Sequence, residues 1–201
     1  MQLNRLEFLA MNNPLRRMHM RFVELKKFQK LLQIHNITLH RKIILDAACG
    51  SGYSLQLLQK AFNPKCLIGF DIMPEQVRIA RRFMGEAGYF LGDITQLPLA
   101  TTCFDAVFAF GIVHHVENWH QALQELYRVL KPGGYLLIEE PDRSTVKFFG
   151  KYLRFAFPAQ GQFTWYEFED AFRQTGFLKT AHTNLYCDCF RSYLLQRPQV
   201  D

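Results

Sequence analysis

Residues 43–52 decide the fold, and they read Ile-Ile-Leu-Asp-Ala-Ala-Cys-Gly-Ser-Gly. The apolar run at 43–45 predicts a short strand that ends at Asp46. The small residues after it predict a tight turn, where the backbone can approach a ligand closely. A helix is predicted over 53–62, so its unpaired N–H groups would lie behind this turn. A strand, a small-residue turn and a helix in this order predict the first unit of a nucleoside-binding α/β sheet.

The same alternation continues along the chain. Further apolar runs predict strands, and helical spacing of apolar residues predicts helices between them; the strands are expected at 66–70, 88–91, 106–110 and 135–138, and the helices at 74–84 and 118–130. Thr164 and Glu167 form a capping box that opens a helix closed by Gly176. The last two strands, at 181–187 and 190–195, are joined by too few residues for a helical crossover, so they must pair antiparallel. The expectation is a Rossmann-like, doubly wound, mostly parallel seven-stranded sheet with an antiparallel terminal strand.

A basic helical arm precedes this region. Residues 1–42 hold nine Lys or Arg and two acids, a net +7, whereas residues 43–201 hold 15 bases and 16 acids. A helix is expected at 15–34, with an inward face of Phe22, Leu25, Phe28 and Leu32. The predicted organisation is an arm or lid at 1–42 and one domain at 43–201, with a lid insertion at 141–162. The arm's charge would attract phosphates or an anionic membrane, or is simply a solvated helix face.

Composition narrows the class of protein. The 201 residues are 49% hydrophobic and 21% charged, which is typical of one globular domain and excludes disordered and fibrous classes. No apolar stretch approaches the roughly 18 residues of a membrane span, and no signal-peptide core is visible near the N-terminus. Five cysteines, an odd number, favour free thiols and a cytoplasmic location.

The residues of the glycine turn indicate which kind of nucleoside ligand the site would bind. Asp71 ends the second strand 19 residues after Gly52, where a carboxylate can bind ribose hydroxyls. Leu55 stands where a dinucleotide fingerprint has its third glycine, and the turn lacks the lysine of a phosphate-binding loop. Asp46 would repel phosphate but suits a cation. The ammonium, sulfonium and ribose of S-adenosylmethionine fit this set.

Residues 43–140 resemble a class I S-adenosylmethionine-dependent methyltransferase of the small-molecule, type 11-like kind. Five motifs in order carry the resemblance: Ile44–Gly52, Gly69-Phe70-Asp71-Ile72, Gly92-Asp93-Ile94, the run from Phe104 to Val116, and Arg128-Val129-Leu130-Lys131-Pro132-Gly133-Gly134. One departure is Ala48, where many members have glycine.

The resemblance implies cofactor roles for eleven residues. The glycine turn would hold the methionine part, Asp71 the ribose, Asp93 the adenine amino group, and the end of the fourth strand the sulfonium side. The expected cofactor-binding residues are Asp46, Ala47, Gly50, Gly52, Asp71, Ile72, Met73, Asp93, Ile94, Phe110 and Gly111. Asp93 as a turn residue and Asp71 as a helix cap are the plainer interpretations. Arg16 or Arg21 of the arm could meet the cofactor's carboxylate.

The acceptor side carries possible bases and many aromatic rings. His114 and His115 follow the fourth strand and are candidate general bases, with Glu117, Glu139 and Glu140 as alternatives; packing roles remain open for both histidines. Residues 141–172 hold ten aromatics, Phe148, Phe149, Tyr152, Phe155, Phe157, Phe163, Trp165, Tyr166, Phe168 and Phe172. They predict a lid over an apolar acceptor, or an interfacial helix at a membrane, or simple core packing.

Three functions are compatible with the sequence. The first is methyl transfer to O, N or C of an apolar or aromatic small molecule, with S-adenosylhomocysteine as product. The second is a nucleic-acid methyltransferase tethered by the basic arm, which is not favoured because no recognition module is evident. The third is a non-catalytic S-adenosylmethionine-binding module. Peripheral membrane contact is compatible with the sequence, and no metal site is expected from the scattered histidines.

Overall fold

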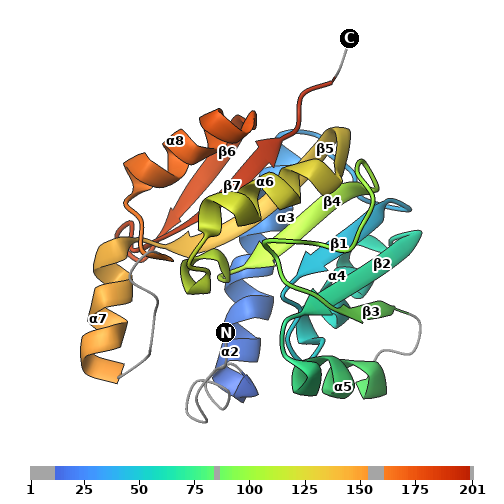
Figure 1. The fold of residues 1–201 in the computed structure, drawn as a ribbon, viewed down its shortest axis with the longest axis horizontal. Helices are drawn as coiled ribbons and strands as arrows, with labels where there is room; N and C mark the ends of the chain where they lie inside the picture. Colours follow the sequence, from blue (N-terminus) through green and yellow to red (C-terminus); the bar gives the residue numbers. More distant parts are fainter. Residues whose placement is uncertain (1–11, 84–86, 154–160, 200–201) are drawn as a thin grey trace.

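The strands form one seven-stranded sheet with the order β3-β2-β1-β4-β5-β7-β6 (Figure 1). The computed structural model describes residues 12–83, 87–153 and 161–199. The strands are β1 (Ile43–Ala47), β2 (Cys66–Asp71), β3 (Gly88–Leu91), β4 (Phe104–Phe110), β5 (Leu130–Pro141), β6 (Leu178–Leu185) and β7 (Phe190–Gln196). β7 runs antiparallel to β5 and β6, and the pairs of β1 to β5 are parallel. The predicted Rossmann-like sheet and its antiparallel terminal strand are confirmed.

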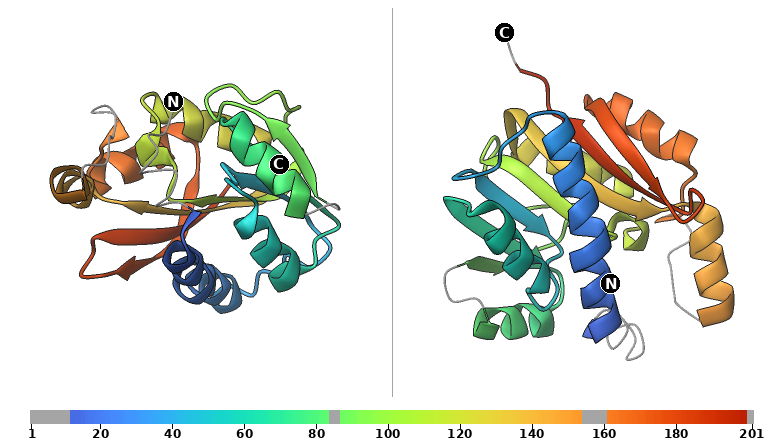
Figure 2. Two further views of the ribbon diagram at one scale, coloured as in Figure 1. Left: turned by 90° about the horizontal axis from the view of Figure 1, so that it is seen from below. Right: turned by 180° about the vertical axis from the view of Figure 1, so that it is seen from behind.

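Helices cover both faces of the sheet (Figure 2). They are α2 (Pro14–His19), the π-helix η1 (Met20–Glu24), α3 (Leu25–Ile34), α4 (Tyr53–Phe62), α5 (Pro74–Phe83), the 3-10 turn η2 (Val113–His115), α6 (Trp119–Val129), α7 (Arg143–Leu153) and α8 (Trp165–Thr175). One core packs α3 and α4 on the sheet, with Phe28 and Leu55 against Phe108. The other packs α6 and α8, with Leu126 and Phe172 against the opposite face.

The strand periodicity predicts most boundaries within a few residues. The capping box of α8 is present, since the Thr164 hydroxyl accepts from the Glu167 N–H and the Glu167 carboxylate accepts from the Thr164 N–H. β6 begins at Leu178, three residues before the prediction, because its pairing with β7 extends to Gln196. Parts of the predicted arm and of the 141–162 insertion, at 1–11 and 154–160, lie outside the described residues.

The N-terminal helix differs from the prediction in its phase. Leu25, Phe28 and Leu32 are buried as expected, but the Phe22 side chain is 58% exposed. Phe22 lies within the π-helix η1, whose wider turn shifts side chains out of the α-helical spacing that α3 follows. Glu24 takes the buried position of this turn. The inward role expected for Phe22 is therefore wrong.

Close packing of α4 on the sheet depends on Gly69 in β2. A Cβ atom at this position would lie 2.6 Å from Leu55 Cδ1 and 2.8 Å from Cys49 Sγ. Leu55 and Cys49 are both buried, so neither can move aside without disturbing the core. Gly69 thus sets how closely the helix behind the glycine turn approaches β2. No described helix is both long and apolar enough to cross a bilayer.

We predict that Gly69→Ala lowers the free energy of unfolding by about 1–3 kcal/mol, because the added methyl overpacks the core. Chemical denaturation measures the change. Gly88→Ala is the matched control, since a Cβ there comes no closer than 3.4 Å to Ile68. Equal effects of the two substitutions would contradict this packing argument.

Candidate functional site

The predicted site residues gather at one edge of the sheet. β1, β2 and β4 are parallel neighbours, so their carboxyl ends at Ala47, Asp71 and Phe110 lie side by side. Ligands of doubly wound sheets bind at this edge, where the order of strands reverses. Here the chain order reverses between β1 and β4, directly beside the glycine turn. The turns after these strands (residues 48–52, 72–73 and 111–115) therefore converge on one place.

The glycine turn is held in a left-handed conformation. The φ angles of Ala48, Gly50 and Gly52 are 57°, 53° and 87°. Gly52 precedes α4, and a Cβ there would lie 3.1 Å from the Cβ of Ala80 in α5. Ala48 tolerates its angle less well than glycine, at about 1–2 kcal/mol for an L-residue in this region. Ala48, which stands where many members of the family have glycine, is therefore a strained position of this turn.

Asp71 ties two of the turns together. Its Oδ2 accepts from the Gly50 N–H at 3.0 Å, and its Oδ1 accepts from the Met73 N–H at 2.9 Å. The side chain is 7% exposed, and burial raises its pKa although both N–H groups oppose that shift. The bond to Met73 is the local capping interaction considered above, and the bond to Gly50 is an additional one. Ile72, 38% exposed, lies at the rim of this edge.

Asp46 lies beneath the glycine turn and is 1% exposed. The Ser54 hydroxyl donates to its Oδ2. Burial raises the pKa of Asp46 to about 7, although the Ser54 bond acts in the opposite direction. Asp46 Oδ1, Gln76 Oε1 and the Tyr89 hydroxyl are among the buried atoms of the described residues that have no hydrogen-bond partner. Buried polar atoms normally form hydrogen bonds, so a bound ligand or water would supply the missing hydrogen-bond partners of these three atoms.

A small cavity opens above these residues. Its volume is about 50 Å³, and Arg16, Met20, Gly50, Gln76 and Phe110 are among the residues that line it. The N-terminal helix therefore forms one wall of the site. The sequence prediction named neither Met20 nor Gln76; a glutamine in the first turn of the helix after Asp71 is the signal that could have indicated the latter.

The Arg16 side chain lies at the cavity, whereas the Arg21 side chain points into solvent. Arg16 pairs with Glu24 and donates from Nη2 to the Phe110 carbonyl at 3.3 Å. Burial alone would raise the pKa of Glu24, but His19 and Arg16 hold it below its usual value. Arg21 is exposed and stacks on Phe22, 5.1 Å from the ring centroid. Of the two arginines proposed for the cofactor's carboxylate, only Arg16 lines the cavity.

Asp93 and Ile94 lie at the same edge, after β3. Asp93 is exposed, and its Oδ1 accepts from the Thr95 N–H at 2.8 Å and the Thr95 hydroxyl at 2.7 Å. This is the turn role considered in the sequence analysis, and it leaves further acceptor capacity on the carboxylate. The Ile94 side chain is 6% exposed. Both residues therefore take part in local structure whatever else they bind.

His114 and Glu140 form a buried pair beyond β4. Glu140 accepts the N–H groups of Ile112, Val113 and His114 at 3.0, 2.7 and 3.3 Å, and His114 Nδ1 lies 2.7 Å from Glu140 Oε2. Burial raises the pKa of Glu140 to about 7. Burial, together with the charge of Arg16, lowers the pKa of His114 to about 3, so its ring is neutral. The His115 ring lies against it, at 4.1 Å between centroids.

Glu139 faces the other side of β5. It accepts from the Ser192 hydroxyl at 2.6 Å, and Gly111, with a φ of 66°, donates its N–H to the Glu139 carbonyl at 2.8 Å. Burial, reinforced by the Glu24 carboxylate, raises the pKa of Glu139. The turn after β4 is thus fixed by neighbouring residues of β5 from two directions.

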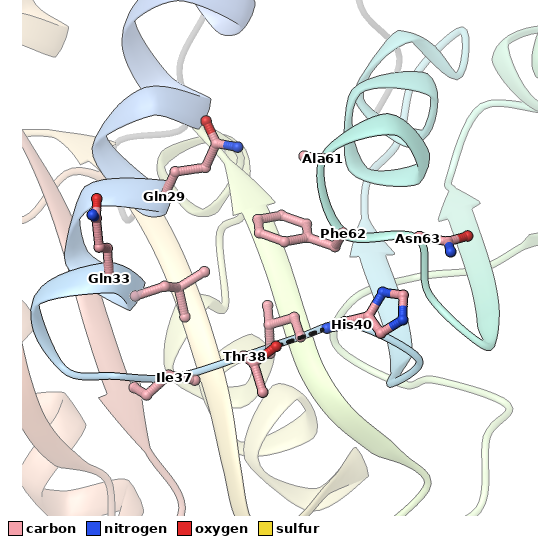
Figure 3. Close-up of a pocket in the computed structure, with 10 residues that line it drawn as sticks. Gln29, Gln33, Ile37, Thr38, His40, Ala61, Phe62 and Asn63 are labelled. Carbon is pink, nitrogen blue, oxygen red and sulfur yellow. Dashed lines mark hydrogen bonds between the residues drawn. The ribbon is translucent and has the colours of Figure 1, made fainter.

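A larger hollow lies at the opposite, amino-terminal edge (Figure 3). It measures about 310 Å³ between α3 and α4, with Gln29, Gln33, His40 and Asn63 around it. None of the predicted site residues contributes to it. Size alone therefore does not identify the site of chemistry in this molecule.

Comparison with known proteins agrees with this geometry. Residues 45–138 match the family model of a methyltransferase domain. The chain is 36% identical over 94 residues to a malonyl-[acyl-carrier protein] O-methyltransferase of Serratia marcescens, covering 47% of this chain and 36% of that one. It is 35% identical over 130 residues to a demethylmenaquinone methyltransferase of Bacteroides fragilis, covering 59% and 53%. The matched stretches thus span about half of these curated relatives or less.

Solved structures show the same fold. An S-adenosylmethionine-dependent methyltransferase from Aquifex aeolicus superposes with a TM-score of 0.71 at 19% identity, covering 94% of this chain and 96% of that one. At this identity the likeness concerns the architecture of the chain.

We predict that Asp46→Asn flattens the dependence of stability on pH. Below about pH 4 both states of Asp46 are protonated, whereas between about pH 4 and pH 7 only the folded state keeps the proton. The wild-type free energy of unfolding therefore falls as pH rises through this window, and the variant loses that contribution. Denaturation at about pH 5 and about pH 8 measures the difference.

Asp105→Asn is the control for this experiment. Burial alone would raise the pKa of Asp105, but the Ile43 N–H and Lys131 hold it below its usual value, so this group is ionised in both states throughout the window. Its removal should leave the slope unchanged. Equal slopes for wild type and Asp46→Asn would refute the buried, protonated state of Asp46.

Proposed function

We propose that this chain, whose residues 45–138 match the family model of a methyltransferase domain, is a class I S-adenosylmethionine-dependent methyltransferase that methylates an apolar or aromatic small molecule at O, N or C. The observation that carries the proposal is the cavity at the glycine turn. Two buried acceptor atoms without described partners, on Asp46 and Gln76, lie at or beneath it, with no Lys in the turn. Such a site suits a cationic ligand with hydroxyl groups better than a phosphate.

The residues present fit S-adenosylmethionine. The left-handed turn leaves room beside Gly50 for its methionine part, since nothing described lies within 4 Å of a Cβ built on Gly50. Both Asp71 oxygens keep acceptor capacity for ribose hydroxyls after their backbone bonds. Ala47, Ile72, Met73, Asp93, Ile94, Phe110 and Gly111 complete the proposed cofactor-binding set. When bound, this cofactor supplies a methyl group that is already activated on sulfur.

The chain's own contribution is to position groups and, for a hydroxyl or thiol acceptor, to accept a proton. We assign this role to His114 rather than His115. Glu140 holds the His114 ring in a fixed orientation through Nδ1, and its carboxylate would stabilise the imidazolium that forms when the ring accepts a proton. An amine or carbon acceptor needs no such step. S-adenosylhomocysteine is the expected product.

The acceptor would enter at the carboxyl edge between the N-terminal helix and α7. Aromatic side chains at this edge, Phe148 and Tyr152 of α7 and Tyr186, favour an acceptor with an apolar or aromatic body. The quinone-type acceptor named for the Bacteroides relative belongs to that class. All five cysteines are free thiols in the structure, which supports a cytoplasmic location.

We predict that Arg16→Gln weakens S-adenosylmethionine binding about tenfold, or about 1.4 kcal/mol. The substitution removes the guanidinium and with it a charge-assisted hydrogen bond to the cofactor's carboxylate, while the glutamine amide can still donate to Glu24. Isothermal titration calorimetry measures the affinity. Arg21→Gln is the control and should bind like wild type; an unchanged affinity for Arg16→Gln would remove this residue from the site.

The purified chain, incubated with methyl-labelled S-adenosylmethionine and fractionated cell extract, should label the lipid or small-molecule fraction. Label in RNA or DNA would support the alternative of a nucleic-acid methyltransferase tethered by its basic arm. Cofactor binding without label in any fraction would count against turnover and favour a non-catalytic binding module.

A further inference from the structure

The carboxyl edge of the molecule carries an unusual set of exposed apolar side chains. Leu15, Met18 and Phe22 of the N-terminal helix are 76, 55 and 58% exposed. Phe148 and Tyr152 of α7 are 55 and 61% exposed. Both helices extend beyond the same edge of the sheet in two opposite views (Figures 1 and 2). Exposed apolar side chains gathered at one edge of a molecule point to an interaction site.

Ring contacts join the two helices into one surface. His19 of α2 stacks on Tyr186 at 5.8 Å between centroids, and Tyr186 contacts Phe190 at 6.2 Å. Phe190 in turn contacts Phe149 of α7 at 6.2 Å, and Phe148 lies 6.0 Å from Phe149. We call the exposed side chains of Leu15, Met18, Phe22, Phe148, Tyr152 and Tyr186 the aromatic rim. Its parts are therefore held in a fixed arrangement.

Positive charge accompanies the aromatic rim. α2, η1 and α7 together contain a single acid, Glu24, which is buried and paired with Arg16. Arg17, Arg21, Lys147 and Lys151 are exposed, and none of them forms an ion pair with a described residue. Lys151 lies 5.2 Å from the Tyr152 ring centroid and Arg21 stacks on Phe22, so bases and apolar groups alternate along the surface.

We propose that the aromatic rim binds an anionic lipid bilayer, with its apolar side chains in the interfacial region and the four bases at the headgroups. Helices with aromatic and aliphatic side chains flanked by Lys and Arg bind membranes in this way. An anionic surface attracts each base with about 1 kcal/mol. An acidic protein partner would match the charge but would not need so many separate exposed apolar side chains.

The orientation has a consequence for the candidate site. The glycine turn and the aromatic rim share the carboxyl edge, so a rim seated on a bilayer turns the mouth of the site toward the membrane. A lipid-soluble acceptor could then enter without crossing water. The membrane binding itself does not depend on the proposed function, and vesicle binding tests it without any activity measurement.

The test is flotation of the full chain with phosphatidylcholine vesicles, with and without phosphatidylserine. Wild type should bind the vesicles that contain phosphatidylserine. Lys147→Gln/Lys151→Gln should weaken this binding at least tenfold, or about 1.4 kcal/mol. Phe148→Ser/Tyr152→Ser should weaken it as well, because the apolar contribution is lost while the charge remains.

Matched controls lie elsewhere on the surface. Lys26→Gln/Lys30→Gln removes two exposed bases of α3, and Tyr166→Ser removes an exposed ring of α8; both variants should bind like wild type. Absence of wild-type binding, or equal losses in rim and control variants, would overturn the proposal. So would a rim that instead holds two copies together, seen as a dimer that Phe148→Ser/Tyr152→Ser converts to a monomer without any vesicle binding.

Discussion

The Asp71 carboxylate is the interaction on which the candidate site depends. It accepts one N–H from the turn after β1 and another from the turn after β2, and so fixes these two backbone segments relative to each other. The left-handed glycine turn stays open above α4 because of this bond and because Gly52 has no Cβ to meet Ala80. Loss of the carboxylate would release both turns, although the sheet beneath them would remain.

Buried acidic side chains dominate the electrostatics around the Asp71 carboxylate. Asp46, Glu139 and Glu140 are each no more than 2% exposed, and burial raises the pKa of all three. Their partners are mainly hydroxyl and N–H groups, and Glu140 also meets the neutral His114 ring. A cation bound nearby would favour their ionised forms, so ligand binding and protonation are linked here. Arg16 is the basic side chain that lines the cavity beside these acids, and it forms an ion pair with Glu24.

The N-terminal helix contributes both to the wall of the cavity and to the aromatic rim. α3 packs on the sheet, η1 offsets the phase, and α2 then projects past the carboxyl edge, where Arg16 meets Phe110. The same offset turns Phe22 outward to the aromatic rim. The helix that closes the cavity is therefore also the helix that offers an apolar, basic face to the surroundings, which couples the proposed membrane contact to the wall of the site.

Local patterns in the sequence were sufficient for the sheet, the capping box and the cluster of turns, because strand and helix periodicity and glycine placement act over a few residues. Asp46, Asp71 and the glycine turn could be singled out for the same reason. The sequence did not reveal the π-turn at Met20–Glu24, the cavity roles of Met20 and Gln76, or the pairing of His114 with Glu140. Those features join residues that are far apart in the chain or depend on the phase of one helix against the sheet. Only tertiary packing decides which side chains such contacts bury, and burial sets their pKa.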